Sequence, residues 1–283
     1  MNESYHQISR IVSQSDAVLI GASNGLSISE GFHLFADNMW FQTHFGDFRL
    51  KYGFRNMLQG MFYAFQTQEE YWTFWGRVIR LQCLQYQPSQ MMLALYELVK
   101  DKPHFVVTSN GENHFVPSGF ASEQVFELEG TFAEMRCVAG CHDEIYFTLE
   151  ATNRMRELEN GLLADTQVPK CPHCGGAMQI NMAVDRSFFT TKRWQRKQAL
   201  YQEFLHQYHG KKLVILELGV GWSNQMIKEP FMRLAASEPN ATYVTFNKGE
   251  VYIPDQIAEK SIGVDGDLSA ILPELLKIVQ EDP

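Results

Sequence analysis

Four of the five cysteines in this 283-residue chain form two closely spaced pairs, Cys137 with Cys141 and Cys171 with Cys174. Two short cysteine turns separated by 29 residues can present four thiolates to one ion, which is the usual arrangement of a tetrahedral zinc site. Four sulfur ligands leave no position for water, so we expect the zinc to be structural. Cys83 lies alone in an aromatic stretch and is expected to be a buried thiol.

A turn of small residues follows the apolar run 17–20 and reads GASNGLSISEGF over residues 21–32. A strand that ends in small residues before a helix can hold a pyrophosphate, because backbone N–H groups face the ligand and no side chain blocks its approach. The spacing differs from the Gly-x-Gly-x-x-Gly of dehydrogenases, and an ordinary tight turn would also explain these glycines. The candidate phosphate contacts are Gly21, Ala22, Ser23, Asn24, Gly25 and Ser27.

Other short apolar runs also end in glycine or polar residues. Residues 105–108 precede Asn110 and Glu112, and residues 125–128 precede Glu129. Ligands of parallel sheets bind beyond the carboxyl ends of the strands, so we expect these side chains to meet at one edge. Three further candidates near later apolar runs are Gly219, Asn247 and Asp267.

The order of apolar runs and helical patterns indicates an α/β fold. Apolar strands alternating with helices predict a Rossmann-like, mostly parallel sheet with helices on both faces. We expect residues 1–132 and 180–283 to form this domain, with an aromatic-rich helical cap at about 36–100. Residues 133–179 are expected to form a small inserted zinc ribbon. Within the sheet domain, the pattern predicts helices at 188–207 and 268–279.

The charge balance limits the classes of partner. The chain has 24 basic and 33 acidic residues, a net charge of -9, which disfavours a nucleic acid backbone as the main partner. The sequence has no uninterrupted apolar run of about 18 residues and no signal-peptide pattern at its start, so we expect a cytoplasmic protein without a membrane partner.

Several segments together resemble the sirtuin family. Residues 21–32 are similar to its Gly-Ala-Gly-Ile-Ser-Ala-x-Ser-Gly-Ile opening, with Ser23 and Asn24 extra or altered. Residues 108–112 resemble the family's Thr-Gln-Asn-Ile-Asp segment, and residues 126–131 resemble its Glu-Leu-His-Gly segment. The cysteine pairs follow where a sirtuin has its zinc ribbon.

The chain resembles most closely the class M sirtuins, a microbial branch often encoded beside macrodomain proteins. This branch is linked with ADP-ribosylation of lipoyl-carrier proteins. The segments that carry this narrower resemblance are residues 53–57, 110–115, 216–221 and 226–231.

The resemblance implies that NAD is the cosubstrate and that its nicotinamide–ribose bond is cleaved. It implies that Asn110 binds a ribose hydroxyl and that Glu112 engages the nicotinamide amide. The small-residue turn would hold the phosphates. The residues facing the adenosine half would be Gly219, Asn247 and Asp267.

Glu129 stands where deacetylating sirtuins carry a histidine that acts as general base. A carboxylate with an ordinary pKa of about 4.3 is a weaker base near neutral pH. We therefore expect Asn110 and Glu129 to be the catalytic residues of a mono-ADP-ribosyltransferase. Its acceptor would be a lipoylated carrier resembling the glycine-cleavage H protein, with a macrodomain protein as a further partner.

Two alternatives remain open from the sequence. One is an NAD-dependent deacylase that uses Glu129 or His114 as base and releases O-acyl-ADP-ribose. The other is a non-catalytic module that binds NAD or ADP-ribose.

Overall fold

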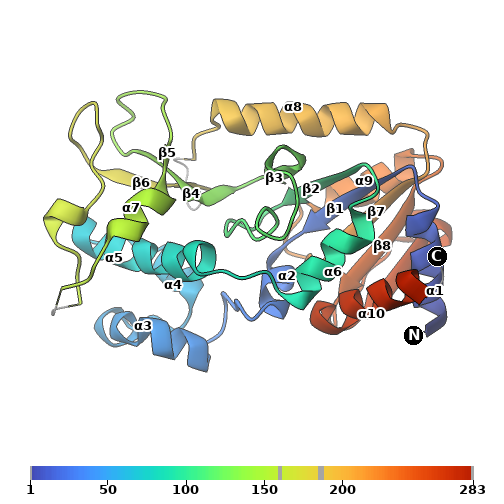
Figure 1. Ribbon diagram of the computed structural model, residues 1–283, viewed down its shortest axis with the longest axis horizontal. Coiled ribbons are helices and arrows are strands. Elements are labelled where there is room, and N and C mark those ends of the chain that lie inside the picture. Colours follow the sequence, from blue (N-terminus) through green and yellow to red (C-terminus); the bar gives the residue numbers. More distant parts are fainter. Residues whose placement is uncertain (1, 159–160, 184–187, 282–283) are drawn as a thin grey trace.

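The computed structural model describes residues 2–158, 161–183 and 188–281. A six-stranded sheet organises one half of the molecule, and every neighbouring pair of its strands is parallel (Figure 1). Its strand order is β3 (Val125–Glu127), β2 (His104–Thr108), β1 (Ala17–Ala22), β7 (Leu213–Leu218), β8 (Thr242–Asn247) and β9 (Ser261–Asp265).

The central strand β1 is buried along its whole length, because helices cover both faces of the sheet. On one face, Val18 and Ile20 pack in a core with α1 (Asn2–Ser13), α6 (Gln90–Val99) and α10 (Leu268–Glu281). On the other face, Leu19 packs in a core with α8 (Lys192–Gln207) and α9 (Lys228–Ser237). Alternating side chains therefore serve two cores, which explains the continuous apolar runs in the sequence.

The fold class expected from the sequence is confirmed, with differences in detail. The pattern predicts a helix from residue 188, but α8 begins at Lys192 because the Thr191 side chain accepts a hydrogen bond from the Trp194 N–H and caps the helix. The edge strand β9 was not predicted. Its only buried residue is Val264, so it lacks the apolar run that marks the other strands.

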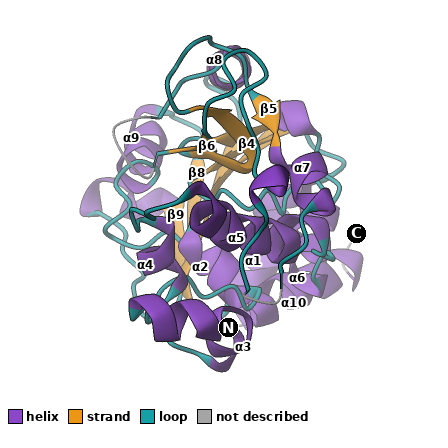
Figure 2. Ribbon diagram, turned by 90° about the vertical axis from the view of Figure 1, so that its left-hand side faces the viewer, coloured by secondary structure: helices purple, strands orange, loops and turns teal. Residues whose placement is uncertain are grey.

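A second lobe is built around a three-stranded antiparallel sheet, which Figure 2 shows beside the helices of the cap. The strand order is β5 (Tyr146–Phe147), β4 (Gly130–Cys137) and β6 (Met178–Met182). The helices of this lobe are α3 (Met39–Tyr52), α4 (Met57–Met61), α5 (Gln68–Ile79), the π-helical η1 (Arg80–Leu84) and α7 (Thr148–Arg154).

The helical cap and the cysteine-bearing sheet share one aromatic core. Trp72, Phe74 and Trp75 of α5 are buried in the same cluster as Phe132 of β4, and the Trp75 and Phe132 rings meet edge to face at 5.4 Å. The Trp72 indole also donates a hydrogen bond to the Met178 carbonyl. These aromatic rings therefore pack between the cap helices and the three-stranded sheet. By contrast, α6 lies against α10 in the core of the six-stranded sheet.

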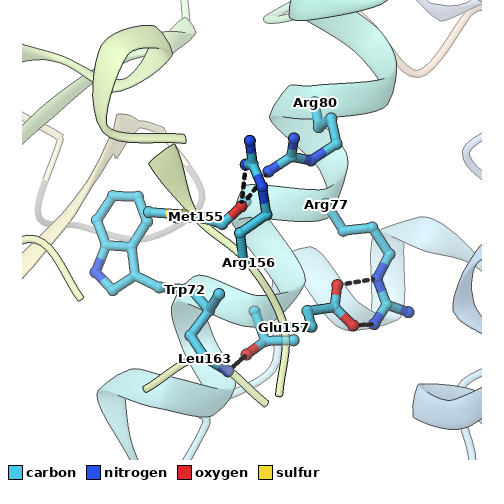
Figure 3. Close-up of a pocket in the computed structure, with 9 residues that line it drawn as sticks. Trp72, Arg77, Arg80, Met155, Arg156, Glu157 and Leu163 are labelled. Carbon is cyan, nitrogen blue, oxygen red and sulfur yellow. Dashed lines mark hydrogen bonds and ion pairs between the residues drawn. The ribbon is translucent and has the colours of Figure 1, made fainter. Parts of the chain in front are cut away.

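Arginines of α5 and η1 join the cap to α7 and to the segment after it (Figure 3). Arg77 is bonded to both Asp47 of α3 and Glu157, at 2.7 and 2.6 Å. Arg80 donates to the carbonyls of Thr152 and Met155. A cavity of about 200 Å³ lies beside these contacts, and none of its described lining residues belongs to the expected NAD site.

Within the described residues, three 3-10 helices complete the fold. They cover connections between longer elements and make no part of either sheet. Their bounds are η2 (Ser122–Gln124), η3 (Asp165–Gln167) and η4 (Asp255–Lys260).

Candidate functional site

The carboxyl ends of β1, β2 and β7 meet at one edge of the six-stranded sheet. Ala22 of β1 is in register with Thr108 of β2 on one side and Leu218 of β7 on the other. The residues that follow each strand therefore lie next to each other. The short helix α2 (Asn24–Ser29) begins directly after β1 at this edge, so the expected arrangement of polar strand ends is confirmed by the register.

Two of the glycines in the turn are explained by protein contacts. A Cβ atom at Gly25 would lie 2.6 Å from the Cα atom of Gly219, and one at Gly21 would lie 2.3 Å from the Phe231 ring of α9. Gly219 also adopts a positive φ of 60°, which favours glycine. The missing bulk at these positions therefore lets the turns after β1 and β7 touch and lets α9 pack on the sheet.

Three amides of the turn are already hydrogen-bonded inside the protein. The N–H groups of Ser23, Gly25 and Leu26 donate to the carbonyls of Leu218, Gly219 and Ser23, at 3.3, 2.9 and 2.9 Å. In this arrangement those amides do not face a phosphate. The phosphate contacts expected at this turn stay a prediction.

Side-chain groups gather at the same edge instead. The Ser109 hydroxyl donates to the Ser23 hydroxyl at 3.0 Å, and the amide of Asn224 donates to both hydroxyls at 2.8 Å. Asn224 was missed by the sequence analysis, which considered only residues directly after the apolar runs. Its one signal is a polar residue in the connection between β7 and α9.

Asn110 lies at the centre of a second buried group. Its side-chain N–H₂ donates to the Ser23 carbonyl at 3.1 Å and to the Ser27 hydroxyl at 2.9 Å, and the Ser27 hydroxyl donates to the Glu112 carboxylate. The Asn110 side-chain oxygen is buried and has no hydrogen-bond partner among the described residues. A buried carboxamide fixed on one side and unsatisfied on the other is prepared to accept a hydrogen bond from a ligand.

Glu129 lies in the turn between β3 and β4, beside the segment that carries Asn110. The Leu128 N–H donates to the Thr108 carbonyl, and the Phe132 N–H donates to the Gly111 carbonyl. No hydrogen bond or ion pair joins the Glu129 carboxylate to another described residue. Burial raises its pKa above the ordinary value, because an ionised carboxylate loses hydration there.

His114 forms a buried hydrogen-bonded pair with Glu30. Its two ring nitrogens lie 2.7 Å from a Glu30 carboxylate oxygen and 2.9 Å from the Gln82 carbonyl, and Tyr86 stacks on the ring at 3.6 Å. Burial works against charge on both partners, but their hydrogen bond and mutual attraction raise the pKa of His114 and lower that of Glu30. Both ring nitrogens of His114 are therefore already hydrogen-bonded inside the protein.

The four paired cysteines converge in the second lobe. The Sγ atoms of Cys137 and Cys174 are 3.7 Å apart, and those of Cys141 and Cys171 are 3.6 Å apart. A tetrahedron with zinc–sulfur bonds of about 2.3 Å requires sulfur separations of about 3.8 Å. The donor set and its spacing therefore fit zinc in a closed, structural site.

Known proteins resemble this chain over most of its length. A Staphylococcus aureus protein named protein ADP-ribosyltransferase is 31% identical over 275 residues, with 94% of this chain and 85% of that protein covered. The chain belongs to the protein ADP-ribosyltransferase family. No family model matches the chain.

A second relative of this ADP-ribosyltransferase family member comes from Fusarium oxysporum. It is named a probable bifunctional ADP-ribose hydrolase/ADP-ribosyltransferase and is 24% identical over 280 residues. The match covers 94% of this chain but 46% of that protein. The chain therefore spans about half the length of this longer relative.

Solved structures show that this ADP-ribosyltransferase family member has the sirtuin fold. A Sir2 homologue in complex with NAD superposes with a TM-score of 0.62 at 14% identity, covering 97% of this chain and 93% of its own. A Sir2 enzyme from a study of mechanism and regulation superposes with a TM-score of 0.61 at 17% identity, covering 99% of both chains.

The remaining expected NAD contacts lie farther along the same edge of this ADP-ribosyltransferase family member. Asn247, at the end of β8, donates its side-chain amide to the Val220 carbonyl at 3.1 Å. Asp267 precedes α10 and accepts hydrogen bonds from the Ser269 N–H and hydroxyl, which lower its pKa, as does Lys248.

Among the described residues, no helix is long and apolar enough to cross a membrane.

Proposed function

We propose that this chain is an NAD-dependent mono-ADP-ribosyltransferase that releases nicotinamide and passes ADP-ribose to an acceptor protein. The observation that carries the proposal is the buried, unsatisfied side-chain oxygen of Asn110 at the carboxyl edge of a sirtuin-fold sheet. An acceptor of this kind is suited to a ribose hydroxyl. Membership of the protein ADP-ribosyltransferase family supports the reaction class.

Asn110, Ser27 and Glu112 would position the nicotinamide half of NAD. The Ser27 hydroxyl accepts from Asn110 and donates to Glu112, so one rotamer of each side chain is held in place. We assign Asn110 to a ribose hydroxyl and Glu112 to the nicotinamide amide. Such preorganised hydrogen bonds lower the barrier because the groups need not reorient as charge develops on the ribose.

We assign the phosphates of NAD mainly to hydroxyl and amide side chains, and less to backbone amides. The hydroxyls of Ser23 and Ser109 and the amide of Asn224 lie within 3.0 Å of one another in hydrogen bonds, and all three can donate to phosphate oxygens after rearranging. Asn24, Gly25 and Ala22 line the same turn. Gly219, Asn247 and Asp267 would face the adenosine half.

Glu129 would act on the acceptor. A partly buried carboxylate with a raised pKa is a better general base near neutral pH than an ordinary glutamate. The absence of a cationic partner among the described residues leaves its oxygens available to an incoming nucleophile. We assign Glu129 to orienting and deprotonating the acceptor, while NAD supplies the activated ribose.

We propose further that the chain is of the class M type and that its acceptor is a lipoylated carrier protein. The segments at 53–57 and 110–115 support this placement by their resemblance to that branch. A macrodomain hydrolase would be the partner that removes the modification. The Fusarium relative, whose name joins an ADP-ribose hydrolase to an ADP-ribosyltransferase, supports that pairing.

Intact-mass spectrometry tests the proposal. The protein is incubated with NAD and either a lipoylated carrier, the same carrier without lipoate, or an acyl-lysine peptide. We expect one ADP-ribose to be added to the lipoylated carrier, and Asn110→Ala to lower the rate by about 10²–10³-fold. Asn240→Ala, at an exposed position, is the matched control and should keep the full rate.

Other outcomes separate the alternatives. Release of O-acyl-ADP-ribose with free lysine would assign a deacylase. Saturable NAD binding without nicotinamide release would assign a binding module. Equal modification of both carriers would retain the transferase but reject the requirement for lipoate.

A further inference from the structure

A second group of metal ligands lies beside the four cysteines. His142, Glu144 and His173 can each bring one ligand atom within 4.8 Å of the other two. The two histidine rings stack at 4.0 Å, although their residues come from the two separate cysteine turns. This places them on a common surface next to the expected zinc.

Hydrogen bonds show how the three side chains converge. One Glu144 oxygen, Oε2, lies 3.1 Å from His173 Nε2 and accepts a hydrogen bond of 2.9 Å from the Tyr146 hydroxyl. The same hydroxyl lies 3.0 Å from His142 Nε2. The three ligands are therefore gathered by contacts in which no lysine or arginine takes part among the described residues.

His142 contacts both groups of ligands. Its Nδ1 lies 2.9 Å from Cys141 Sγ, and its Nε2 lies 3.0 Å from the Tyr146 hydroxyl that also contacts Glu144. The Nε2 atom is therefore the His142 nitrogen on the side of Glu144.

The surroundings leave room for a fourth ligand. Glu144 and His173 are at least half exposed, at 64% and 50% of their side-chain surface. His142 and Glu144 also line a cavity of about 550 Å³ that reaches Lys192 and Arg193 at the start of α8. Two imidazoles, one carboxylate and an open position form the ligand set that zinc uses in sites that keep a water.

We propose that His142, Glu144 and His173 form a second metal site that binds a zinc-class divalent cation. It is distinct from the four-cysteine site, to which it is linked by the His142–Cys141 contact. The cation has three protein ligands and completes its coordination with water or an anionic group from the cavity. The proposal does not depend on the activity assigned to the NAD site.

Zinc titration of the full-length protein tests this proposal. Protein that already holds one tightly bound zinc is titrated with zinc alone, and binding is followed by calorimetry and by metal content. We expect a second equivalent to bind. Glu144→Gln and His173→Gln should each weaken that second equivalent by at least about tenfold while the first is retained. His206→Gln, an exposed histidine on α8, is the matched control.

Cobalt substitution gives a second readout. A four-thiolate site shows sulfur-to-metal charge transfer, whereas a site of nitrogen and oxygen ligands does not. The second cobalt should therefore add only weak visible absorption, lost in Glu144→Gln. Binding that stops at one equivalent would overturn the proposal. The proposal would also be overturned if both variants, Glu144→Gln and His173→Gln, still bound the second equivalent. It would be overturned as well if these variants lost the first metal.

Discussion

Glu129 shows how one residue's surroundings can suit it to a reaction. Its carboxylate is partly buried without a counter-ion among the described residues, and burial raises its pKa. An uncharged carboxyl is favoured in the folded state, so ionisation of Glu129 costs stability. That cost is absent below the unfolded pKa and complete above the higher folded pKa.

We therefore expect Glu129→Gln to slow ADP-ribose transfer by about 10²–10⁴-fold and to raise the free energy of unfolding at neutral pH. The rate of ADP-ribose transfer by the natural protein should increase as the pH rises through the raised pKa of Glu129. Rates from pH 4 to 8 and urea unfolding at pH 7 measure both effects. Unchanged turnover in the variant would remove Glu129 from the mechanism.

Gly25 is a glycine because the neighbouring backbone leaves no room for a side chain. A Cβ atom there would overlap the Gly219 backbone at 2.6 Å, and backbone cannot rotate aside. We expect Gly25→Ala to lower the free energy of unfolding by about 1–3 kcal/mol and to weaken NAD binding. Gly46→Ala in α3, where a Cβ meets nothing within 4 Å, is the control and should leave both quantities nearly unchanged.

At the scale of elements, the Glu30–His114 pair joins the end of α2 to η1 and to the segment after β2. Both side chains are at most 5% exposed, and Glu30 also accepts hydrogen bonds from Tyr86 and Ser89. The pair holds together elements that are far apart in the sequence. We expect His114→Gln to cost about 3–5 kcal/mol, because a buried carboxylate loses its cation.

The pH dependence of this pair has a definite sign. The raised pKa of His114 gives stability that is complete below its unfolded pKa and lost as pH rises through the folded pKa. The lowered pKa of Glu30 gives stability that is lost as pH falls through its folded pKa. The difference in unfolding free energy between the natural protein and His114→Gln should thus be largest between these limits. A difference independent of pH would contradict the ion pair.

At the scale of the whole molecule, the zinc site and the helical cap depend on one core. Cys137 and Cys171 are buried in the same cluster as Trp72 and Trp75, whereas the six-stranded sheet has separate cores on its two faces. Loss of the metal should therefore loosen the second lobe before the sheet.

We expect Cys171→Ser, or removal of zinc by a chelator, to shift tryptophan fluorescence to longer wavelength and to lower the melting temperature. Much of the circular dichroism of the α/β domain should remain. Cys83→Ser should keep the zinc content and the fluorescence, since Cys83 lies outside the four-sulfur cluster. Full retention of the folded signal without zinc would show that the metal is not structural.

The sequence alone was informative where neighbouring residues decide the structure. The apolar run 105–108, for example, forms strand β2 with one further residue at its start, because its β-branched and aromatic residues favour a strand. The start of α8 was predicted too early, since the Thr191 cap is a local hydrogen bond that periodicity does not contain. Asn224 was missed because its partners, Ser23 and Ser109, lie 201 and 115 residues away.

By itself, the sequence determined the alternation of strands and helices, the cysteine ligand set and the polar residues after the strands. These features depend on spacing over a few residues, which the chain carries directly. Only the tertiary structure decided that Gly25 packs against the Gly219 backbone and that His114 is hydrogen-bonded to Glu30. It also decided that the side-chain oxygen of Asn110 has no hydrogen-bond partner among the described residues. Each depends on distant segments packing together and excluding water, which sets the hydrogen bonds and charges that a buried group can keep.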